Sequence, residues 1–328
     1  AMNGRGILIA EHTRCFPGRD VRRTRPDRRR TRRGGMSETV SSRDSRFSSE
    51  PLSVSWIHGS ESAKHNTDPD LQVHWYDPHT VILRQNMAVN YEAPFLYLLF
   101  GPSRAVLLDT GATSDPAFLP LRHTVDEIMT SWLAEHPREN YELVVLHSHE
   151  HDDHIAGDAQ FLGRPGTTVV GADQTSAWSF LGFTEDPSAI RTLDLGGRDL
   201  LALATPGHDA AAITLYDPWT GILFTGDTVY RGRLYIDDWT AFTETIDRLV
   251  AFSEQHPVTH VLGCHIEMSQ SPGVDYPVRS TFQPHEAPLE MSVAHLVEIR
   301  AAIAQWGTVP TRYTANDFIL WPDADESD

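Results

Sequence analysis

Apolar residues along this chain gather in short runs between about residue 71 and residue 306, and the runs differ in their spacing. The segments 71–86 and 93–112 each hold two apolar runs around a turn signal, Asp-Pro in the first and Gly-Pro-Ser in the second. Each segment therefore predicts two adjacent strands. Short apolar runs predict further strands at 141–149, 167–172, 193–208, 211–227 and 258–265.

Three segments have helical spacing instead. In residues 124–136 the apolar side chains recur every three or four positions, which places them on one face of a helix. The segment 239–256 is amphipathic in the same way, and 288–306 predicts a helix near the C-terminus. Because strands and helices alternate in both halves of the chain, we predict the α/β fold class, with the elements in stacked layers.

Residues 1–55 lack this pattern. Eleven arginines and three acids give residues 1–35 a net charge of +8, and a serine-rich run follows them. Such a composition buries too little apolar surface to offset the entropy of ordering, so we predict a disordered leader at 1–55. The alternative interpretation of the arginines is a tether to nucleic acid or to a membrane surface.

The rest of the composition limits the partners. No apolar run approaches the ~20 residues that a membrane-spanning helix needs, so no membrane partner is expected. The two cysteines, Cys15 and Cys264, give no disulfide framework, and we see no export signal, so we expect a cytoplasmic location. The net charge of −18 minus the +8 of residues 1–35 leaves −26 for residues 36–328, which disfavours a nucleic-acid partner.

The densest polar cluster follows an apolar run, in the stretch VVLHSHEHDDHIAG at residues 144–157. In an extended segment, residues two apart point to the same side, so His149 and His151 can hold one ion together. The adjacent Asp153 and His154 point elsewhere and can hold a second ion. Imidazole and carboxylate suit zinc. The structural alternative is a charged turn in which Asp153 caps a helix.

Three later predicted strands each end on a residue that can bind a metal, namely His208, Asp227 and His265. Taken one at a time, each is more easily explained as a structural or surface residue. Together they complete two sites with the histidine cluster, and a carboxylate can bridge two cations ~3.5–4 Å apart.

This combination resembles the metallo-β-lactamase-fold hydrolases. The matching segments are LLDTGA, HSHEHDDHIAG, TPGHDAAAITLYD, FTGD and the strand-final His265, in the family's order, over roughly residues 72–270. The resemblance implies a four-layer αββα sandwich with a dinuclear metal site at one edge. We therefore place the catalytic domain at 56–310, including the C-terminal helix, and a C-terminal segment with an acidic tail at 311–328.

The resemblance also assigns roles to residues. It implies that His149, His151 and His208 hold the first metal, that Asp153, His154 and His265 hold the second, and that Asp227 bridges the two. It implies that Asp109 orients a ligand from behind. Two positions depart from the family pattern. His147 is an extra histidine, which we interpret as supporting or incidental, and Cys264 stands where the family often has glycine and is interpreted as a buried thiol rather than a soft ligand.

The implied reaction is attack by a metal-held hydroxide on a small ester-like bond, which is a carboxylic ester, a lactone or a thioester, with two Zn²⁺ as cofactors. Asp153 or Asp227 could shuttle the proton. The spacing from Asp227 to Tyr230 resembles a lactonase pattern in which the tyrosine hydrogen-bonds the substrate carbonyl. Simple packing of Tyr230 at the strand end is an equal alternative.

Other functions stay open at this point. The branch of lactonases and glyoxalase II-like thioesterases is favoured over strict β-lactamases, which generally lack the bridging aspartate, so β-lactam hydrolysis remains only as a side activity. Glutathione is doubtful because the C-terminal segment is short and acidic. A persulfide dioxygenase-like oxidoreductase would use one Fe²⁺ on His149, His208 and Asp227, but its second site is conventionally empty. A non-catalytic metal-binding protein would have no evident reason to retain seven ligands.

The substrate is expected to be a small molecule, and a homodimer is compatible with the sequence. Loops at 178–190, 230–240 and 266–288 are expected to form the pocket walls, with seven aromatic residues: Trp178, Phe180, Phe183, Tyr235, Trp239, Tyr276 and Phe282. Arg231 and Arg233 could recognise a substrate carboxylate, but we favour surface pairing with Asp237 and Asp238.

Overall fold

The computed structural model describes residues 48–322, and residues 1–47 and 323–328 lie outside the described part. Most of the predicted leader and the acidic tail therefore cannot be compared with it. Residues 48–55 form no helix or strand, yet they lie against the folded body. The backbone N–H of Leu52 donates to the Glu290 carboxylate at 3.1 Å, and Leu52 packs on the core.

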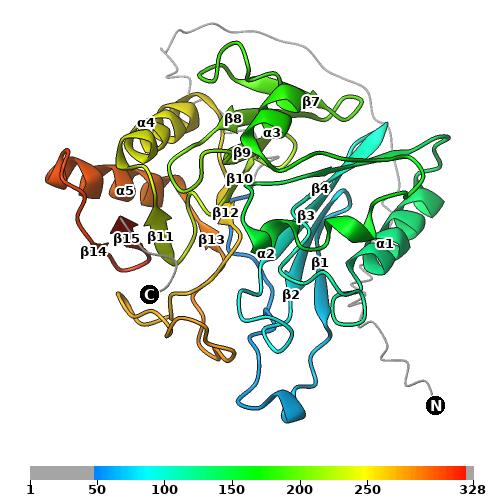
Figure 1. Cartoon of the computed structure of the whole chain (residues 1–328), viewed down its shortest axis with the longest axis horizontal. Coiled ribbons are helices and arrows are strands. Elements are labelled where there is room, and N and C mark those ends of the chain that lie inside the picture. Colours follow the sequence, from blue (N-terminus) through cyan, green and yellow to red (C-terminus); the bar gives the residue numbers. More distant parts are fainter. Residues whose placement is uncertain (1–47, 323–328) are drawn as a thin grey trace, which may run out of the picture. The chain divides into compact units, whose positions relative to one another are not determined.

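The first six-stranded sheet contains the N-terminal strands in chain order (Figure 1). Its strands are β1 (Leu71–Asp77), β2 (Thr80–Gln85), β3 (Phe95–Phe100), β4 (Arg104–Leu108), β5 (Glu142–Leu146) and β6 (Thr167–Val169). The first four pair antiparallel, as the two predicted hairpins require, and β4, β5 and β6 run parallel. Helix α1 (Leu121–Glu135) makes the crossover from β4 to β5.

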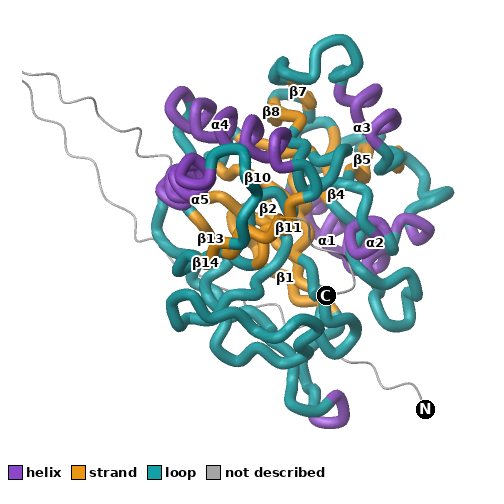
Figure 2. The backbone as a smooth tube through the Cα atoms, turned by 60° about the vertical axis from the view of Figure 1, so that its left-hand side comes forward, coloured by secondary structure: helices purple, strands orange, loops and turns teal. Residues whose placement is uncertain are grey.

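The second six-stranded sheet has the order β13-β12-β10-β9-β8-β7. Its strands are β7 (Arg191–Asp194), β8 (Asp199–Ala204), β9 (Ile213–Asp217), β10 (Ile222–Gly226), β12 (His260–Gly263) and β13 (Glu290–Met291). Helix α4 (Trp239–Gln255) lies between β10 and β12 in the chain, and β10 and β12 pair in parallel. Helix α5 (Val293–Trp306) follows β13 and packs beside α4 (Figure 2).

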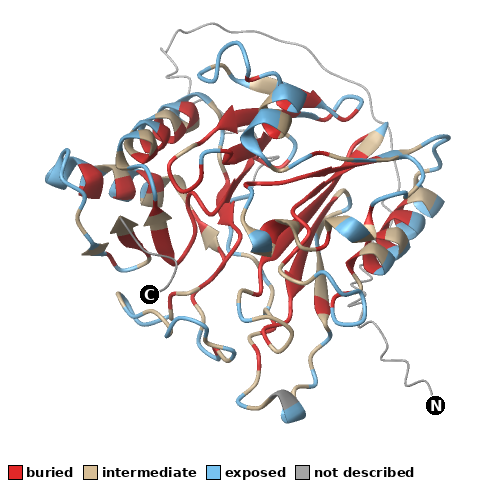
Figure 3. Cartoon of the chain, in the orientation of Figure 1, coloured by how far each residue is buried: buried red, intermediate tan, exposed pale blue. Residues whose placement is uncertain are grey.

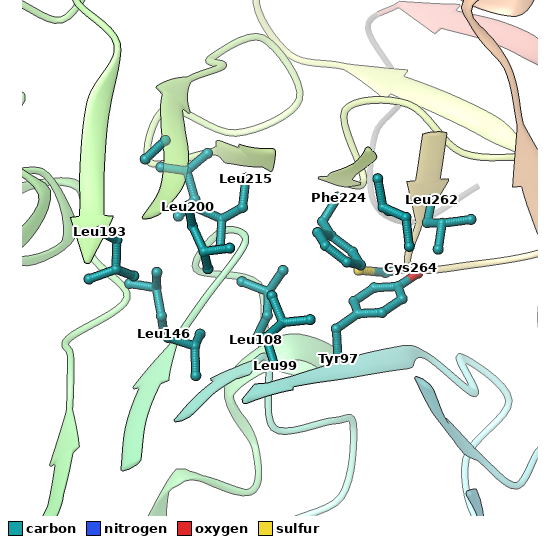
Figure 4. Close-up of a cluster of buried hydrophobic side chains, with 14 of the residues drawn as sticks. Tyr97, Leu99, Leu108, Leu146, Leu193, Leu200, Leu215, Phe224, Leu262 and Cys264 are labelled. Atoms are coloured by element: carbon teal, nitrogen blue, oxygen red, sulfur yellow. The ribbon is translucent and has the colours of Figure 1, made fainter. Parts of the chain in front are cut away.

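The two sheets face each other and bury a continuous apolar layer between them. Figure 4 shows Tyr97, Leu108 and Leu146 of the first sheet opposite Leu215 and Phe224 of the second. On the outer faces, α1 packs on the first sheet, while α4 and α5 pack on the second. Buried residues accordingly concentrate in the strands, and exposed residues lie on the outward faces of the helices (Figure 3). The predicted four-layer αββα sandwich is confirmed.

One fully buried ion pair joins the two sheets. Arg198, at the turn before β8, donates through Nε and Nη2 to both carboxylate oxygens of Asp217 at 3.1 and 2.6 Å. The same guanidinium donates to the Phe100 carbonyl and the Thr80 hydroxyl of the first sheet and to the His79 carbonyl in the turn between β1 and β2. Every strong donor of this buried cation thus has an acceptor, as burial of a charge requires.

Several elements were not predicted. A third sheet is formed by β11 (Arg233–Ile236), β14 (Tyr313–Thr314) and β15 (Ile319–Pro322), and β15 lies in the middle of it. The chain after residue 310, which we expected to lie outside the domain, is therefore part of the folded body up to residue 322. Short helical segments also occur at η1 (Ala63–His65), α2 (Asp152–Ile155), η2 (Asp158–Gln160) and α3 (Gln174–Leu181). In the described part, no helix is both long and apolar enough to cross a membrane.

Candidate metal centre

Seven side chains meet where loops from both sheets come together. His149 and His151 follow β5, and the next ligand candidates, Asp153 and His154, lie in α2. The second sheet contributes the other three, His208 after β8, Asp227 after β10 and His265 after β12. They form two groups that could each hold an ion, His149, His151 and His208 in one, and Asp153, His154, Asp227 and His265 in the other, with the donor atoms of each group within 4.8 Å of one another.

The first group is three imidazoles. Nε2 of His208 lies 3.3 Å from Nε2 of His149 and 3.2 Å from Nδ1 of His151. Nitrogens bound tetrahedrally at ~2.0–2.1 Å from a zinc ion are themselves about 3.3 Å apart. The spacing of these nitrogens therefore fits one ion between them.

The second group pairs two imidazoles with two carboxylates. Nε2 of His265 lies 3.2 Å from Asp153 Oδ2 and 3.3 Å from Asp227 Oδ2, and Nε2 of His154 lies 3.2 and 3.5 Å from the same oxygens. Two buried atoms of this group, His154 Nε2 and Asp227 Oδ1, have no hydrogen-bond partner among the described residues. Buried polar atoms are rarely left unpaired, so these two fit the ligands of a metal ion.

In three of these histidines, the second ring nitrogen, Nδ1, has a hydrogen-bond partner outside the two groups. Nδ1 of His208 lies 2.9 Å from the carbonyl of Tyr235, and Nδ1 of His265 lies 2.9 Å from the carbonyl of Glu92. In the same way Nδ1 of His154 meets Asp109 Oδ2 at 3.0 Å. Contacts of this kind fix the tautomer that leaves Nε2 free to bind a metal.

Asp109 lies at the centre of these supporting contacts. Its carboxylate accepts hydrogen bonds from the Ser148 backbone N–H at 2.6 Å and the Ser148 hydroxyl at 2.8 Å, in addition to its contact with His154. Its backbone is in the left-handed region, with φ of 67°. Few residues other than glycine adopt this conformation, and aspartate and asparagine do so most readily. The role proposed for Asp109 from the sequence agrees with this geometry.

Burial and nearby charges shift the pKa values of the histidines in opposite directions in the two groups. Burial lowers the pKa of His149 and of His208, so both imidazoles are neutral and ready to bind a cation. Burial also lowers the pKa of His154 and of His265, but the Asp153 and Asp227 carboxylates outweigh it and raise both pKa values well above 6.5. Because a metal ion binds a deprotonated ring nitrogen, metal binding at these two histidines would release protons.

His147 and Cys264 lie outside the two groups. Nε2 of His147 contacts Asp158 at 2.8 Å instead of a candidate ligand, so it does not support the site directly. The Cys264 thiol donates to Asp109 Oδ2 at 3.3 Å, and the three donors Asp109, His154 and Cys264 also lie close together. Burial raises the pKa of the Cys264 thiol to about 12, which favours the buried thiol over a soft ligand.

Tyr230 is placed differently from the lactonase-like hypothesis. Its ring is buried, with its centroid 5.6 Å from that of the His265 ring. Its hydroxyl, however, donates to the carbonyl of Arg233 and lies 3.2 Å from the Glu267 carboxylate. The proton that the lactonase-like interpretation gives to a substrate carbonyl is thus donated within the protein, which fits the alternative interpretation, packing at the strand end.

The arginines after Asp227 are likewise not on the surface. The expected surface pairing of these arginines with Asp237 and Asp238 is wrong. Both side chains turn inward, and Arg231 and Arg233 are only 7% and 3% exposed. Arg231 pairs with Asp317 in the loop between β14 and β15. Arg233 pairs with Glu267 at 2.5 Å and Asp275 at 2.8 Å. Sequence spacing could not reveal these partners, which lie 34 to 86 residues away.

A cavity of about 530 Å³ opens above the two groups. Five of the candidate ligands line it, His151, Asp153, His208, Asp227 and His265. The segments 230–240 and 266–288 contribute to its walls as expected, but 178–190 does not, because Phe183 and Trp178 pack into the core between the sheets. Of the seven aromatic residues proposed for the walls, Tyr235 alone lines the cavity, whereas Tyr91 and Trp321 were missed.

The family model of the metallo-beta-lactamase superfamily matches residues 92–300 of the chain. The chain belongs to this superfamily. The match covers every candidate ligand, from His149 to His265, together with Asp109. Membership of the metallo-beta-lactamase superfamily therefore rests on the segments that carry the site.

Named relatives within the superfamily cover less of the chain. A hydroxyacylglutathione hydrolase from Synechococcus sp. (strain JA-3-3Ab) is 33% identical over 138 residues, which is 42% of this chain and 50% of the relative. A hydroxyacylglutathione hydrolase from Brucella anthropi is 25% identical over 191 residues, 55% of this chain and 68% of the relative. The chain thus spans about half the length of the first of these relatives. A solved metallo-beta-lactamase from Pontibacter korlensis has a TM-score of 0.45 at 18% identity, covering 71% of this chain and 99% of that one.

Proposed function

We propose that this protein is a metal-dependent hydrolase of small acyl thioesters or related esters, with two divalent ions, of which zinc is the leading candidate. The observation that carries the proposal is the convergence of seven donor side chains, of which two have unpaired buried atoms and five line a cavity. The thioester is placed first because the curated relatives include hydroxyacylglutathione hydrolases.

The donor set suits this chemistry. When bound, a pair of divalent ions supplies a nucleophilic water near neutral pH and a Lewis acid for a carbonyl oxygen. His149, His151 and His208 would hold one ion, Asp153, His154 and His265 the other, and Asp227 would contact both. The Asp153 side chain is 21% exposed and that of Asp227 is 9% exposed. This difference favours Asp153 as the carboxylate that receives a proton at the cavity floor.

The charge of the residues that line the cavity indicates which thiol part of the substrate is preferred. Apart from the candidate ligands, five acids line the cavity, Glu92, Glu150, Asp152, Asp237 and Glu267, against two arginines, Arg233 and Arg279. Arg233 is already paired with Glu267 and with Asp275. A surface of this charge disfavours a thiol with two carboxylates such as glutathione. We therefore expect the preferred thioester to carry a neutral or cationic thiol part.

The test begins with metal content. The protein is purified without added metal or chelator, and metals are measured by mass spectrometry. Hydrolysis is then followed for a hydroxyacyl thioester of glutathione, the same acyl group on a neutral thiol, a carboxylic ester, a lactone and a β-lactam. We expect about two zinc ions per chain, as the two groups of ligands imply, and the highest kcat/KM for the neutral thioester.

Other outcomes would change the proposal. About one iron per chain, with oxygen uptake on persulfides and no hydrolysis, would replace it by oxidation chemistry. Two metals with no turnover of any member of the panel would remove the ester-like substrate class. A preference for the glutathione thioester would keep the hydrolase but reject the argument from the acidic lining.

A further inference from the structure

We propose that Tyr235, and not Tyr230, is the residue that hydrogen-bonds the substrate's carbonyl oxygen and the negative charge that develops on it. The inference rests on the proposed hydrolase function and adds a catalytic residue to it. It follows from the directions of the hydrogen bonds around Arg233, which engage the proton of one tyrosine and leave the proton of the other free.

The Tyr230 hydroxyl has a proton to donate, and the donation is made to the Arg233 carbonyl. The ring of Tyr230 is 2% exposed, and its oxygen also lies 3.2 Å from Glu267 Oε2. Both neighbours are acceptors, so any rotation of the hydroxyl leaves the proton within the wall of the cavity. A carbonyl in the cavity would have to break this bond before it could use Tyr230.

The Tyr235 hydroxyl is in the opposite situation. Its oxygen accepts a hydrogen bond from Arg233 Nε at 2.8 Å, and among residues 48–322 it has no acceptor for its own proton. A phenol carries its proton at neutral pH and can donate while it accepts. Tyr235 is partly buried and lines the cavity, so the free donor is available to a ligand there.

The position of Tyr235 is tied to the candidate metal ligands through the backbone. Its carbonyl lies 2.9 Å from Nδ1 of His208, which forms the first group together with His149 and His151. Tyr235 lies in β11, which pairs in parallel with β15, and its ring lies 5.6 Å from the Trp321 ring. Tyr235 is therefore held beside the group of ligands on a paired strand rather than on a free loop.

Arg233 prepares the Tyr235 hydroxyl for this role. Its terminal nitrogens donate to Glu267 at 2.5 Å, Asp275 at 2.8 Å and the Tyr276 carbonyl at 2.8 Å, and these contacts fix the guanidinium. A cationic N–H that donates to a phenol oxygen draws electron density from it and strengthens the phenol as a donor. A fixed donor of this kind stabilises an oxyanion without reorganisation during the reaction.

The step balances without transfer of the tyrosine proton. As a water oxygen bonds to the acyl carbon, the C=O π electrons move onto the carbonyl oxygen, where Tyr235 donates its hydrogen bond. When the C=O bond re-forms, the C–S bond breaks, and the sulfur leaves with the proton that the water released. Tyr235 keeps its proton throughout.

The experiment compares three phenylalanine variants. For Tyr235→Phe we expect kcat on the best thioester to fall ~10–10³-fold, the upper end being the range for loss of one oxyanion donor, with KM changed much less. Tyr230→Phe should lose less than about threefold in kcat, since Tyr230 also lines the cavity but its hydroxyl proton is donated to the Arg233 carbonyl. Tyr276→Phe is the matched control, because the Tyr276 hydroxyl accepts from the His285 N–H and does not line the cavity.

Equal losses in the Tyr235 and Tyr230 variants, or an unchanged Tyr235→Phe, would overturn the inference while leaving the hydrolase intact. Metal content and melting temperature are measured on each variant, so that a purely structural loss is recognised. A second readout does not depend on turnover, namely calorimetric binding of a phosphonate monoester as a tetrahedral anion. Tyr235→Phe should weaken it about tenfold relative to wild type, the effect of one lost hydrogen bond to a charged oxygen. Equal phosphonate affinities would reject Tyr235 even if the wild type hydrolyses none of the esters.

Discussion

At the scale of single residues, Asp109 supports the second group of ligands without binding an ion itself in our assignment. We predict that Asp109→Asn lowers zinc affinity about 10–100-fold, the usual cost of losing such a supporting contact. Asparagine keeps the left-handed backbone accessible, so the fold should survive. Zinc competition with a coloured chelator measures the change.

The matched control is Asp158→Asn, which removes the partner of His147 and should change zinc affinity by less than roughly threefold, since it touches no candidate ligand. Equal losses in the two variants would mean that His147 supports the site as well, or that Asp109 acts only on the fold.

His151 is the most accessible histidine of the candidate site, with a side chain that is 33% exposed. We predict that His151→Ala loses metal from the first group and nearly all hydrolysis, because two imidazoles alone bind zinc weakly. Metal analysis and the thioester assay check this together, with the exposed His123→Ala as a control that should retain both. A metal-free but fully active His151→Ala would contradict the metal mechanism.

Cys264 provides a prediction about pH. Its pKa is raised to about 12, so at pH 8 its thiolate fraction is roughly 10³-fold below that of an ordinary thiol. In a variant with Cys15→Ser, alkylation of the native protein at pH 8 should therefore be slower than that of the unfolded protein by at least this factor. The sign for stability follows, because the raised pKa contributes stability below about pH 9 that is lost as the pH rises toward 12. Rapid native labelling would instead indicate an accessible thiol.

The ligand residues could be predicted from sequence because their types and spacing are local, as in His149, His151 and His154. The roles of Tyr230 and Arg233 could not, since they depend on Glu267, which comes close only after β12 is in place. A tyrosine three residues after an aspartate says nothing about where its proton points.

At the scale of elements, Arg198 connects the two sheets. We predict that Arg198→Ala lowers the free energy of unfolding by about 3–5 kcal/mol, because Asp217 is left buried and unpaired. For a chain of this size that corresponds to a melting temperature lower by roughly 10 °C.

Arg104→Ala is the comparison for Arg198, since its pair with Glu142 spans 4.0 Å between exposed side chains. Thermal unfolding of the two variants should differ clearly, with Arg104→Ala close to wild type. A small loss for Arg198→Ala would show that water or repacking satisfies Asp217.

Most strands of the two main sheets were predictable because they are apolar runs of four to seven residues next to a turn signal. An exception is β13, which has two residues and lies within the segment 288–306 for which we predicted a helix. The third sheet was not, because β14 has two residues and β11 carries an arginine and a tyrosine within four positions. Pairing between distant segments, and not local pattern, makes these residues strands.

At the scale of the whole molecule, the third sheet makes the C-terminal part of the described chain necessary for the site. A chain ended at residue 310 would lose Phe318, Ile319 and Leu320, which are at most 2% exposed. Their burial stabilises the fold by together about 5–9 kcal/mol, and β11 would lose its partner. We predict that such a chain is unfolded or metal-poor by circular dichroism and metal analysis, whereas a chain ended at residue 322 retains both. Normal folding and metal content of the shorter chain would show that β11 holds Tyr235 and His208 unaided.

Each group of candidate ligands draws on loops from both sheets, His149 and His151 from one side and His208 from the other, and likewise in the second group. A bound ion would therefore connect the two sheets of the sandwich. Such a connection lowers the rate of unfolding as well as raising the free energy of unfolding, because the sheets cannot separate until the ion has left. The half-life of heat inactivation should then depend on which ion is bound, and a chelator should shorten it even at temperatures where the metal-free protein is still folded.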